Sequence, residues 1–337
     1  MNQVAQKRVA PKRVALVGCG SIGALHAKHL AGRAELVFCS RTRANAEHFN
    51  SQFGGLGVFD RYEDLLQDER VDAILLATPA ALHKDQIIAA LSAGKATLVE
   101  KPICISAGEL DEITTAARQG GGNPTLMIAE NYYYKPSLAS MRQMIQSGDI
   151  GQVRSIEVRK LTRQQPGGWR QPLGSLLEGG VHFLALIGDL ADVSLGKVVP
   201  GESEVVHSPL SLLARFPTRT APEPERHAHV ELLYGEDEED LSASLHYAWD
   251  VPSATKGTFQ HSRINGDAGR ITFESNGIYI WLSGRRRRLK LSSLGDLLGY
   301  KAMMEDFLHC LECGNSPYSN LERARRDMGI VFKAYAG

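Results

Sequence analysis

The stretch RVALVGCGSIGALHA, residues 13–27, decides the fold of the first part of the chain. RVALV is a short run with strand character, and ALHAKHL, which begins at Ala24, has the apolar spacing of a helix. Between them, Gly18 permits a tight turn, Gly20 a close backbone approach to a pyrophosphate, and Gly23 close helix–strand packing. The free amides of the helix start can bind that anion. The stretch therefore predicts the strand, turn and helix of a dinucleotide-binding fold.

Strand-like and helix-like segments alternate through the residues that follow. AELVFCS (34–40), VDAILLATP (71–79) and ATLVEKP (96–102) are apolar runs of strand length, and segments with helical spacing separate them. This alternation predicts an α/β fold with a doubly wound parallel sheet, whose ligands bind outside the carboxyl ends of the strands. Lys101 follows one of these strands, so we expect it beside a nicotinamide ring.

The end of the second predicted strand bears on the choice of nucleotide. A fold selective for NAD usually has an acidic residue there, which accepts hydrogen bonds from the ribose hydroxyls. Here Ser40, Arg41, Thr42 and Arg43 follow the strand instead. Guanidinium groups can pair with a 2′-phosphate, so the sequence favours NADP over NAD. The alternative is a solvated turn that opens the next helix.

The bulk composition limits the classes of function. At 337 residues the chain is long enough for two domains, and its 38 Lys and Arg balance its 38 Asp and Glu. A formal net charge of zero provides no basic field for nucleic acid or an anionic membrane. We therefore expect a small-molecule substrate, with neither nucleic acid nor a membrane as partner. No apolar run is long enough for a membrane span, and the glycines after Val17 argue against an export signal.

The cysteines and histidines give no sign of a disulfide framework or a metal site. The five cysteines are scattered and odd in number, which suits a reducing compartment, so we expect a cytoplasmic protein. Cys310 and Cys313 form a C-x-x-C without a second pair at metal spacing. His227 and His229 alternate on a predicted strand and also lack a third ligand in the sequence. The sequence predicts no metal.

Three stretches together resemble the glucose-fructose oxidoreductase and inositol dehydrogenase family, known as Gfo/Idh/MocA. They are GCGSIGALHAKHL from residue 18, the segment 60–103 that contains T-P-x-x-x-H and E-K-P, and ENYYYKPSLASMRQMIQSGDIGQV from residue 130. INGDAGRITF (264–273) resembles later strands of the family. The resemblance implies a Rossmann domain over residues 1–130. It also implies a C-terminal α/β domain over 131–337, with an open, mostly antiparallel sheet that binds substrate and forms a homodimer or homotetramer.

The resemblance also implies the reacting groups. The lysine of E-K-P, here Lys101, contacts the reacting centre in the family, and an acid followed four residues later by histidine supplies the other polar groups. Glu178 stands at the acid position, which is more often aspartate, and His182 stands at the histidine position. On a helix these two residues would share a face. The alternative reading is a helix-start carboxylate and a core histidine.

Hydride loss from a carbinol carbon requires that its hydroxyl also lose a proton. We expect His182 to accept that proton in oxidation, Lys101 to donate to the reacting oxygen, and Glu178 to orient the pair or bind a neighbouring hydroxyl. Lys101 and His182 could exchange the proton role, because burial can tune either nitrogen.

The resemblance extends to the cofactor and substrate contacts. The implied contacts with NADP or NAD are Gly18, Gly20, Ser21, Ile22, Gly23, Ser40, Arg41, Thr78, Pro79, His83, Glu100, Lys101 and Asn131. Besides Glu178 and His182, the expected substrate contacts are Tyr133, Trp169 and Arg170, since aromatic faces and an arginine suit a polyhydroxylated ring.

The sequence therefore predicts an NAD(P)-dependent oxidoreductase. Its expected substrate is a secondary hydroxyl or ketone of a sugar, sugar derivative or cyclitol. The alternatives are an enzyme acting on a non-sugar carbonyl or a dihydrodiol, and a nucleotide-sensing regulator without turnover.

Overall fold

The computed structural model describes residues 12–119, 125–165, 167–168, 172–196, 206–217, 223–235, 241–253 and 257–337. The chain divides into two compact units. The first unit contains the described residues up to 100, together with 113–127 and 304–317, and the second contains 101–112, 128–303 and 318–337. The chain thus passes from one unit to the other several times, whereas the sequence predicted a single boundary at residue 130. Each unit is described by itself below.

A parallel sheet forms the centre of the nucleotide-binding fold. Its strands in the described residues follow the order β3-β2-β1-β4-β5-β6. All the pairings recorded among β1 to β5 are parallel. The strands are β1 (Arg13–Val17), β2 (Glu35–Cys39), β3 (Gly57–Phe59), β4 (Ala73–Leu76), β5 (Ala96–Val99) and β6 (Leu126–Ile128). Each residue of β4 is buried, as expected for a parallel strand covered on both faces. The predicted Rossmann-type sheet is confirmed.

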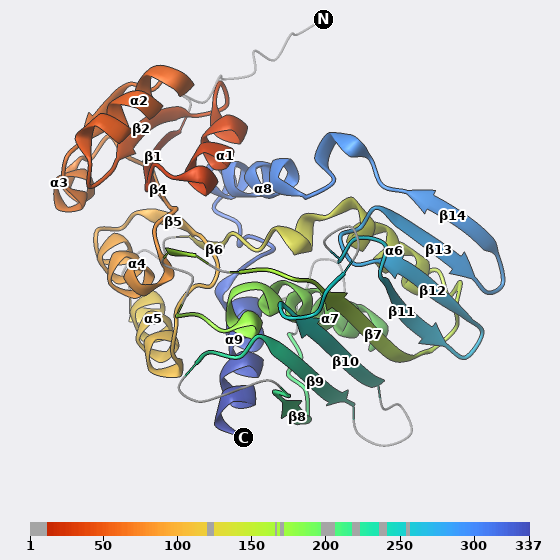
Figure 1. Cartoon of the computed structure of the whole chain (residues 1–337). Helices are drawn as coiled ribbons and strands as arrows, with labels where there is room; N and C mark the ends of the chain where they lie inside the picture. The colour runs from red at the N-terminus through yellow and green to blue at the C-terminus, as the bar shows by residue number, and fades with distance from the viewer. Residues whose placement is uncertain are drawn as a thin grey trace, which may run out of the picture. The chain divides into compact units, whose positions relative to one another are not determined.

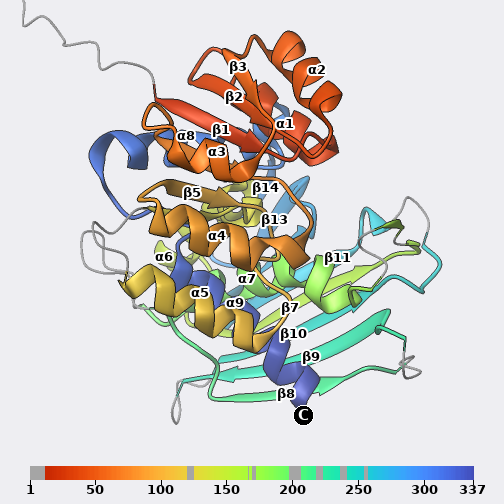
Figure 2. The same ribbon diagram turned by 90° about the vertical axis from the view of Figure 1, so that its left-hand side faces the viewer.

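Helices accompany this sheet in the described residues. They are α1 (Ser21–Leu30), α2 (Arg43–Phe53), α3 (Tyr62–Gln67), α4 (His83–Ser92), α5 (Ala107–Gln119), α8 (Tyr300–Cys313) and the single turn η1 (Ala80–Leu82). Helix α2 ends where Gly54 takes a left-handed conformation, and it packs Phe49 and Phe53 on Phe38 of β2. Figure 2 shows α4 running alongside β5, which it contacts.

The second unit contains the open sheet that the family resemblance implied. Its strands in the described residues follow the order β14-β13-β12-β11-β7-β10-β9-β8. Its pairs are antiparallel except for the parallel pair β7–β10. The strands are β7 (Val153–Leu161), β8 (Ser211–Arg215), β9 (His227–Tyr234), β10 (Leu241–Ala248), β11 (His261–Gly266), β12 (Gly269–Glu274), β13 (Tyr279–Ser283) and β14 (Arg287–Leu291). Buried and more exposed residues alternate along β9, so one face of the sheet is packed.

Helices cover that packed face. They are α6 (Pro136–Gln146), α7 (Val181–Ser194) and α9 (Leu321–Ala336), with short turns at η2 (Asn131–Tyr134), η4 (Leu176–Gly180) and η7 (Leu294–Asp296). Helix α7 is buried along almost its whole length and contacts α6, α9, β7 and β10, and Figure 1 shows it lying against the sheet. No helix in the described part of the chain is both long and apolar enough to cross a bilayer.

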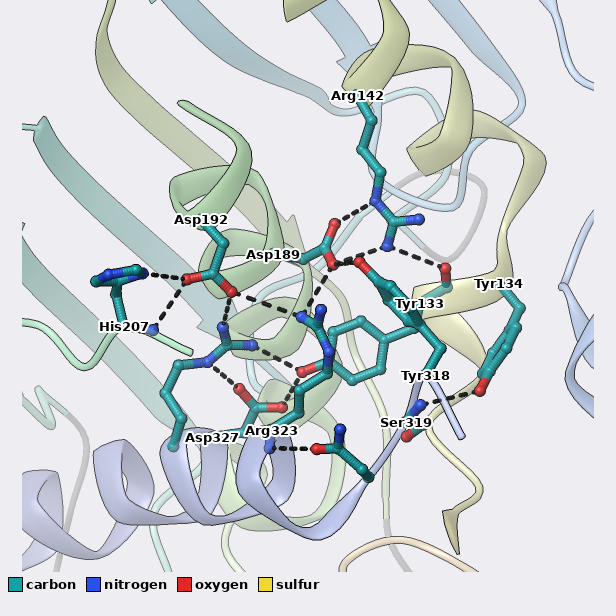
Figure 3. Close-up of polar contacts among 12 residues, drawn as sticks. Tyr133, Tyr134, Arg142, Asp189, Asp192, His207, Tyr318, Ser319, Arg323 and Asp327 are labelled. Atoms are coloured by element: carbon teal, nitrogen blue, oxygen red, sulfur yellow. Dashed lines mark hydrogen bonds and ion pairs between the residues drawn. The ribbon is translucent and has the colours of Figure 1, made fainter. Parts of the chain in front are cut away.

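A buried charge cluster joins α6, α7 and α9. It consists of Arg142, Asp189, Asp192, Arg323, Arg326 and Asp327. Figure 3 shows Arg142, Asp189, Asp192, Arg323 and Asp327 lying close together. Asp189 accepts from Arg142 Nε at 2.6 Å and from Arg142 Nη2 at 2.7 Å. Burial alone would raise the pKa of Asp189, but Arg142 and Arg323 hold it below its usual value. The cluster fixes the helix that carries His182.

Candidate active site

Lys101 lies directly after β5 and contacts Glu178. Its Nζ donates to the Glu178 backbone carbonyl at 2.7 Å and lies 3.7 Å from Glu178 Oε1. The side chains are 16% and 14% exposed, so the pair is largely but not fully removed from solvent. Glu178 lies in the π-helical turn η4 that runs into α7, whereas the sequence predicted an ordinary helical turn. Such turns often occur at functional sites.

His182, in the first turn of α7, is held by a carboxylate that the sequence reasoning did not single out. Its Nδ1 lies 2.6 Å from Glu130 Oε1 and 2.9 Å from Oε2. Glu130 is 4% exposed and also accepts from the backbone amide of Tyr132 at 3.1 Å. We assign the Nδ1 proton to this contact because a carboxylate accepts hydrogen bonds, which leaves Nε2 of the neutral ring as an acceptor. The arrangement is that of an oriented base.

The ring of Tyr132 lies flat against this imidazole. The two ring centroids are 4.8 Å apart with an interplanar angle of 17°, and Lys135 Nζ lies 3.5 Å from the same Tyr132 centroid. Lys135 is 2% exposed and donates to the Asn276 carbonyl at 2.9 Å. Burial lowers the pKa of Lys135 to about 7, against the opposing effect of Glu274 and Glu130.

Lys101 and Glu130 also line one small cavity of the second unit. Pro102, Ile103, Ile128 and Val181 give it apolar walls, and Tyr133 and Asp327 lie on its border with the buried charge cluster. Lys101 and the carboxylate that holds His182 therefore share a partly apolar setting, in which polar interactions are stronger than in water.

The glycine turn of the first unit has the form that a pyrophosphate site needs. Gly18 has a φ of 106°, and a Cβ on it would overlap the Ala77 carbonyl, while a Cβ on Gly23 would overlap the carbonyl of Gly18. Gly20 is exposed and has open space beside its Cα, which suits close approach of a phosphate. Ser21 and Ile22 begin α1 there. The residues present fit a dinucleotide.

At the end of β2 the two arginines differ. Arg43 is bonded to Glu47 Oε1 at 2.7 Å and to Asp60 Oδ2 at 2.6 Å. Arg41 is exposed, and Ser40 before it accepts from the Thr42 amide at 3.4 Å. Arg41 is therefore better placed than Arg43 to pair with a ligand.

Thr78, Pro79 and His83 form a local hydrogen-bonded unit after β4. Thr78 Oγ1 donates to Gln86 Oε1 at 2.6 Å, and His83 Nε2 lies 2.8 Å from the Thr78 carbonyl oxygen. His83 is 1% exposed, so it supports the loop from inside. A direct contact with the cofactor, predicted for His83, would need that imidazole to leave its buried position.

Glu100 and Asn131 are also committed to protein partners. Glu100 Oε1 lies 2.6 Å from Nε2 of the buried His26, which the sequence reasoning did not assign. Asn131 Nδ2 donates to the Leu298 carbonyl at 2.7 Å. Both side chains are buried, so their predicted nicotinamide contacts stay predictions.

The predicted substrate residues have different placements. Tyr133 is 2% exposed, and its hydroxyl donates to Asp327 Oδ2 at 2.5 Å and accepts from Arg326 Nη2 at 2.8 Å. A substrate contact through that hydroxyl would have to replace these bonds. Trp169 and Arg170 lie outside the described residues.

His246 of β10 lies against the two alternating histidines of β9, a contact that the sequence did not indicate. His227 Nε2 and His246 Nε2 are 2.6 Å apart, and the ring centroids of His229 and His246 are 5.5 Å apart. Even so, no group of side chains among the described residues has the arrangement of a metal site. All five cysteines are free thiols.

Residues 12–125 match the model of an oxidoreductase family with an NAD-binding Rossmann fold. This match confirms the Gfo/Idh/MocA resemblance, and it confirms a nicotinamide dinucleotide as the cofactor class of this domain.

Two curated relatives match part of the chain. One is the dTDP-3,4-didehydro-2,6-dideoxy-alpha-D-glucose 3-reductase of Actinomadura kijaniata, 31% identical over 53% of this chain and 55% of its own. The other is the trans-1,2-dihydrobenzene-1,2-diol dehydrogenase of Mus musculus, 31% identical over 45% of this chain and 47% of its own. The chain thus spans about half the length of the curated relatives it matches.

A solved structure matches nearly the whole chain. It is an oxidoreductase from Agrobacterium radiobacter in complex with NAD+, L-tartaric acid and magnesium, with a TM-score of 0.79 and 17% identity. The match covers 97% of this chain and 96% of that one. At this identity the likeness establishes a shared fold over both units.

Proposed function

The chain carries a nucleotide-binding domain of the Gfo/Idh/MocA family, and on that premise we propose that it is an NAD(P)-dependent oxidoreductase acting on sugars. The reaction interconverts a secondary hydroxyl and a ketone on a sugar, a sugar derivative or a cyclitol. The observation that carries this proposal is that Lys101, which contacts Glu178, lines the same cavity as Glu130, which orients His182.

His182 is the proton acceptor in oxidation. With Nδ1 held by Glu130, its Nε2 presents a lone pair that can take the hydroxyl proton of the substrate. The imidazolium that results lies 2.6 Å from a carboxylate oxygen, which stabilises it. A nicotinamide dinucleotide held at the glycine turn of Gly18, Gly20 and Gly23 would supply the hydride chemistry in both directions.

Lys101 donates a hydrogen bond to the reacting oxygen. Its ammonium carries three N–H donors, and one of them is bonded to the Glu178 carbonyl. As the hydroxyl becomes an alkoxide, a cation at this position stabilises the developing charge. The Glu178 carboxylate lies 3.7 Å from Nζ and binds a neighbouring hydroxyl of the substrate.

The preferred nucleotide is NADP. The end of β2 lacks the carboxylate that would bind ribose hydroxyls and would repel a 2′-phosphate, and the exposed Arg41 follows it. A guanidinium there can hold a phosphate bidentately.

A substrate panel tests the activity. The purified chain is mixed with NAD or NADP and with sugars, sugar nucleotides, glycosides, cyclitols and a cyclic dihydrodiol, and nicotinamide absorbance is followed. We expect turnover with at least one carbohydrate class, and Lys101→Met should abolish it while nucleotide binding stays nearly unchanged. Lys333→Met, which removes an exposed lysine of α9, is the matched control. Turnover that survives in Lys101→Met would remove this residue from the mechanism, and nucleotide binding without any turnover would favour a sensor.

We also propose a homodimer or homotetramer through the open sheet, whose outer face otherwise meets solvent. Trp281 and Leu289, paired on β13 and β14, are exposed apolar side chains that such packing would cover. Light scattering should give at least twice the monomer mass, and a monomer at micromolar concentration would refute this proposal. The cytoplasmic location expected from the cysteines stays a prediction.

A further inference from the structure

We propose that Lys135 is a positioning residue that acts on His182 through the ring of Tyr132, holding the imidazole in place and opposing its protonation. This role deepens the proposed function and rests on it for the assignment of His182 as the proton acceptor.

The geometry places Lys135 and His182 on opposite faces of one aromatic ring. Lys135 Nζ lies 3.5 Å from the Tyr132 centroid, and the nearly parallel imidazole of His182 is centred 4.8 Å from it. An ammonium and a stacked ring this close to one centroid would overlap if they shared a face. Tyr132 is therefore sandwiched between the two groups.

This sandwich is fixed on all sides. Phe183 contacts the edge of the Tyr132 ring with a centroid distance of 5.2 Å, and the Tyr132 amide is bonded to Glu130. Lys135 is tied to the Asn276 carbonyl, and Glu130 holds the imidazole at Nδ1. Because each member has one well-defined position, the ring plane of His182 is set before substrate binds.

The electrostatic effect follows from the distances. The ammonium is separated from the imidazole by about 8 Å at most, with an aromatic ring and no room for water between them. Lys135 is attracted by the negative face of the Tyr132 ring and polarises the ring toward itself. The opposite face of the ring therefore attracts a second cation less strongly. A positive charge on Lys135 therefore disfavours the imidazolium form of His182.

Other charged groups face the sandwich and set its balance. Glu130 and Glu274 favour positive charge on Lys135, whereas Lys160, a second buried lysine, opposes it. Tyr247 and Tyr300 lie near Tyr132 in addition to these carboxylates. Glu178, whose carbonyl accepts from Lys101, lies one turn before His182. Burial lowers the pKa of Lys135 to about 7, so this lysine gains its charge as the pH falls through neutrality. Its opposition to a protonated His182 consequently grows in the range in which a histidine would become charged.

The consequence is that Glu130 and Lys135 act on the imidazole in opposite directions. Glu130 alone would favour the protonated form of His182, and an imidazolium cannot accept a proton from a substrate hydroxyl. Lys135 offsets that effect while Glu130 keeps the ring oriented.

The test follows the His182 ring by NMR in protein labelled at histidine. The His182→Gln variant identifies its signal. Lys135→Met removes the charge with little change in volume, and we expect the titration midpoint of His182 to rise by about half to one pH unit. Lys135→Arg keeps a charge at every accessible pH and should leave the midpoint at or below that of the original chain.

Lys95→Met is the matched control. It removes another buried ammonium, 8% exposed and bonded to the Asp68 and Val71 carbonyls, from the first unit. A midpoint that stays within about 0.2 units in Lys135→Met would overturn the proposal. An equal shift in Lys95→Met would also overturn it, because the effect would then be a general consequence of removing a buried lysine. If Lys135→Met does not fold, Lys135→Arg decides alone, since a rise of the midpoint in that variant contradicts the role.

The NMR readout does not depend on turnover. If no substrate of the panel reacts, the proposed function fails while the His182 titration still reports on Lys135. If turnover is found, the acid limb of the kcat/KM profile should move with the NMR midpoint.

Discussion

Replacing Glu130 with glutamine separates the charge of this residue from its shape. Glutamine has nearly the same volume and retains one carbonyl oxygen that can accept the Nδ1 proton of His182. The imidazole should therefore keep its orientation, and the Tyr132 amide can still find an acceptor. What is lost is the negative charge that lies 2.6 Å from Nδ1.

The magnitude follows from the role of that charge in the transition state. A hydrogen bond to a charged group contributes about 1.5–3 kcal/mol, and in oxidation the imidazolium forms only as the proton is transferred. Because each 1.4 kcal/mol is a factor of about ten in rate, kcat/KM for oxidation should fall roughly 10- to 150-fold. The acid limb of the pH profile should move to lower pH, because the carboxylate no longer favours the protonated ring.

The assay is kcat/KM for alcohol oxidation as a function of pH, measured at saturating nucleotide with a substrate found in the panel. Glu225→Gln is the matched control, because Glu225 is also buried and its Oε1 accepts from the Leu176 amide and the Tyr335 hydroxyl. If Glu130→Gln stays within about twofold of the original chain, the carboxylate does not assist proton transfer. An equal loss in Glu225→Gln would attribute the effect to general destabilisation.

Three further variants test the nucleotide site and the buried charges. Arg41→Ala should weaken binding of NADP(H) by about tenfold or more and binding of NAD(H) far less, as measured by fluorescence titration. Equal weakening of the two nucleotides refutes the assignment, and so does the same selective loss in Arg43→Ala, which removes an arginine already paired with Asp60. Lys135→Met should raise the free energy of unfolding at pH 7 by about 1–3 kcal/mol in urea titrations. Because the pKa of Lys135 is lowered in the folded protein, the folded chain binds fewer protons than the unfolded chain between about pH 7 and the pKa of the unfolded lysine. The stability advantage of the variant should therefore shrink toward about pH 10, and an advantage that does not change with pH would contradict this explanation. Asp189→Asn should cost about 3–5 kcal/mol at pH 7, because Arg142 loses its buried partner. Because the pKa of Asp189 is lowered in the folded protein, its carboxylate stabilises the fold at pH values above the pKa of the unfolded aspartate, and this stabilisation is lost as the pH falls. The difference in stability between the original chain and Asp189→Asn should therefore be smaller in acid.

The predictions that succeeded from sequence concern local backbone. The glycine turn after β1 follows from a positive φ at Gly18 and a close approach at Gly23, both of which depend on neighbouring residues. The alternation of apolar strands and helices likewise predicts the parallel sheet, because burial on both faces leaves a continuous apolar run. The approach of Lys101 to Glu178 was anticipated only through the family resemblance.

Side-chain partners distant in sequence could not be predicted in this way. Nothing near Glu130 indicates that it binds His182, and the His26–Glu100 contact joins two segments whose own patterns are those of an ordinary helix and strand end. The backbone partners of His83 and Asn131, both predicted to contact the cofactor, were likewise not indicated by the sequence.

The sequence by itself determined that this chain has a Rossmann-type domain and where its glycine turn and E-K-P lysine lie, because such features are set by local conformation and periodicity. Only the tertiary structure decided that Glu130 orients His182 and that Tyr132 separates it from Lys135. The physical reason is that η2, α7 and the strands beneath them meet only when the second unit packs its core. Burial in that core then makes each buried charge dependent on the partners that packing supplies.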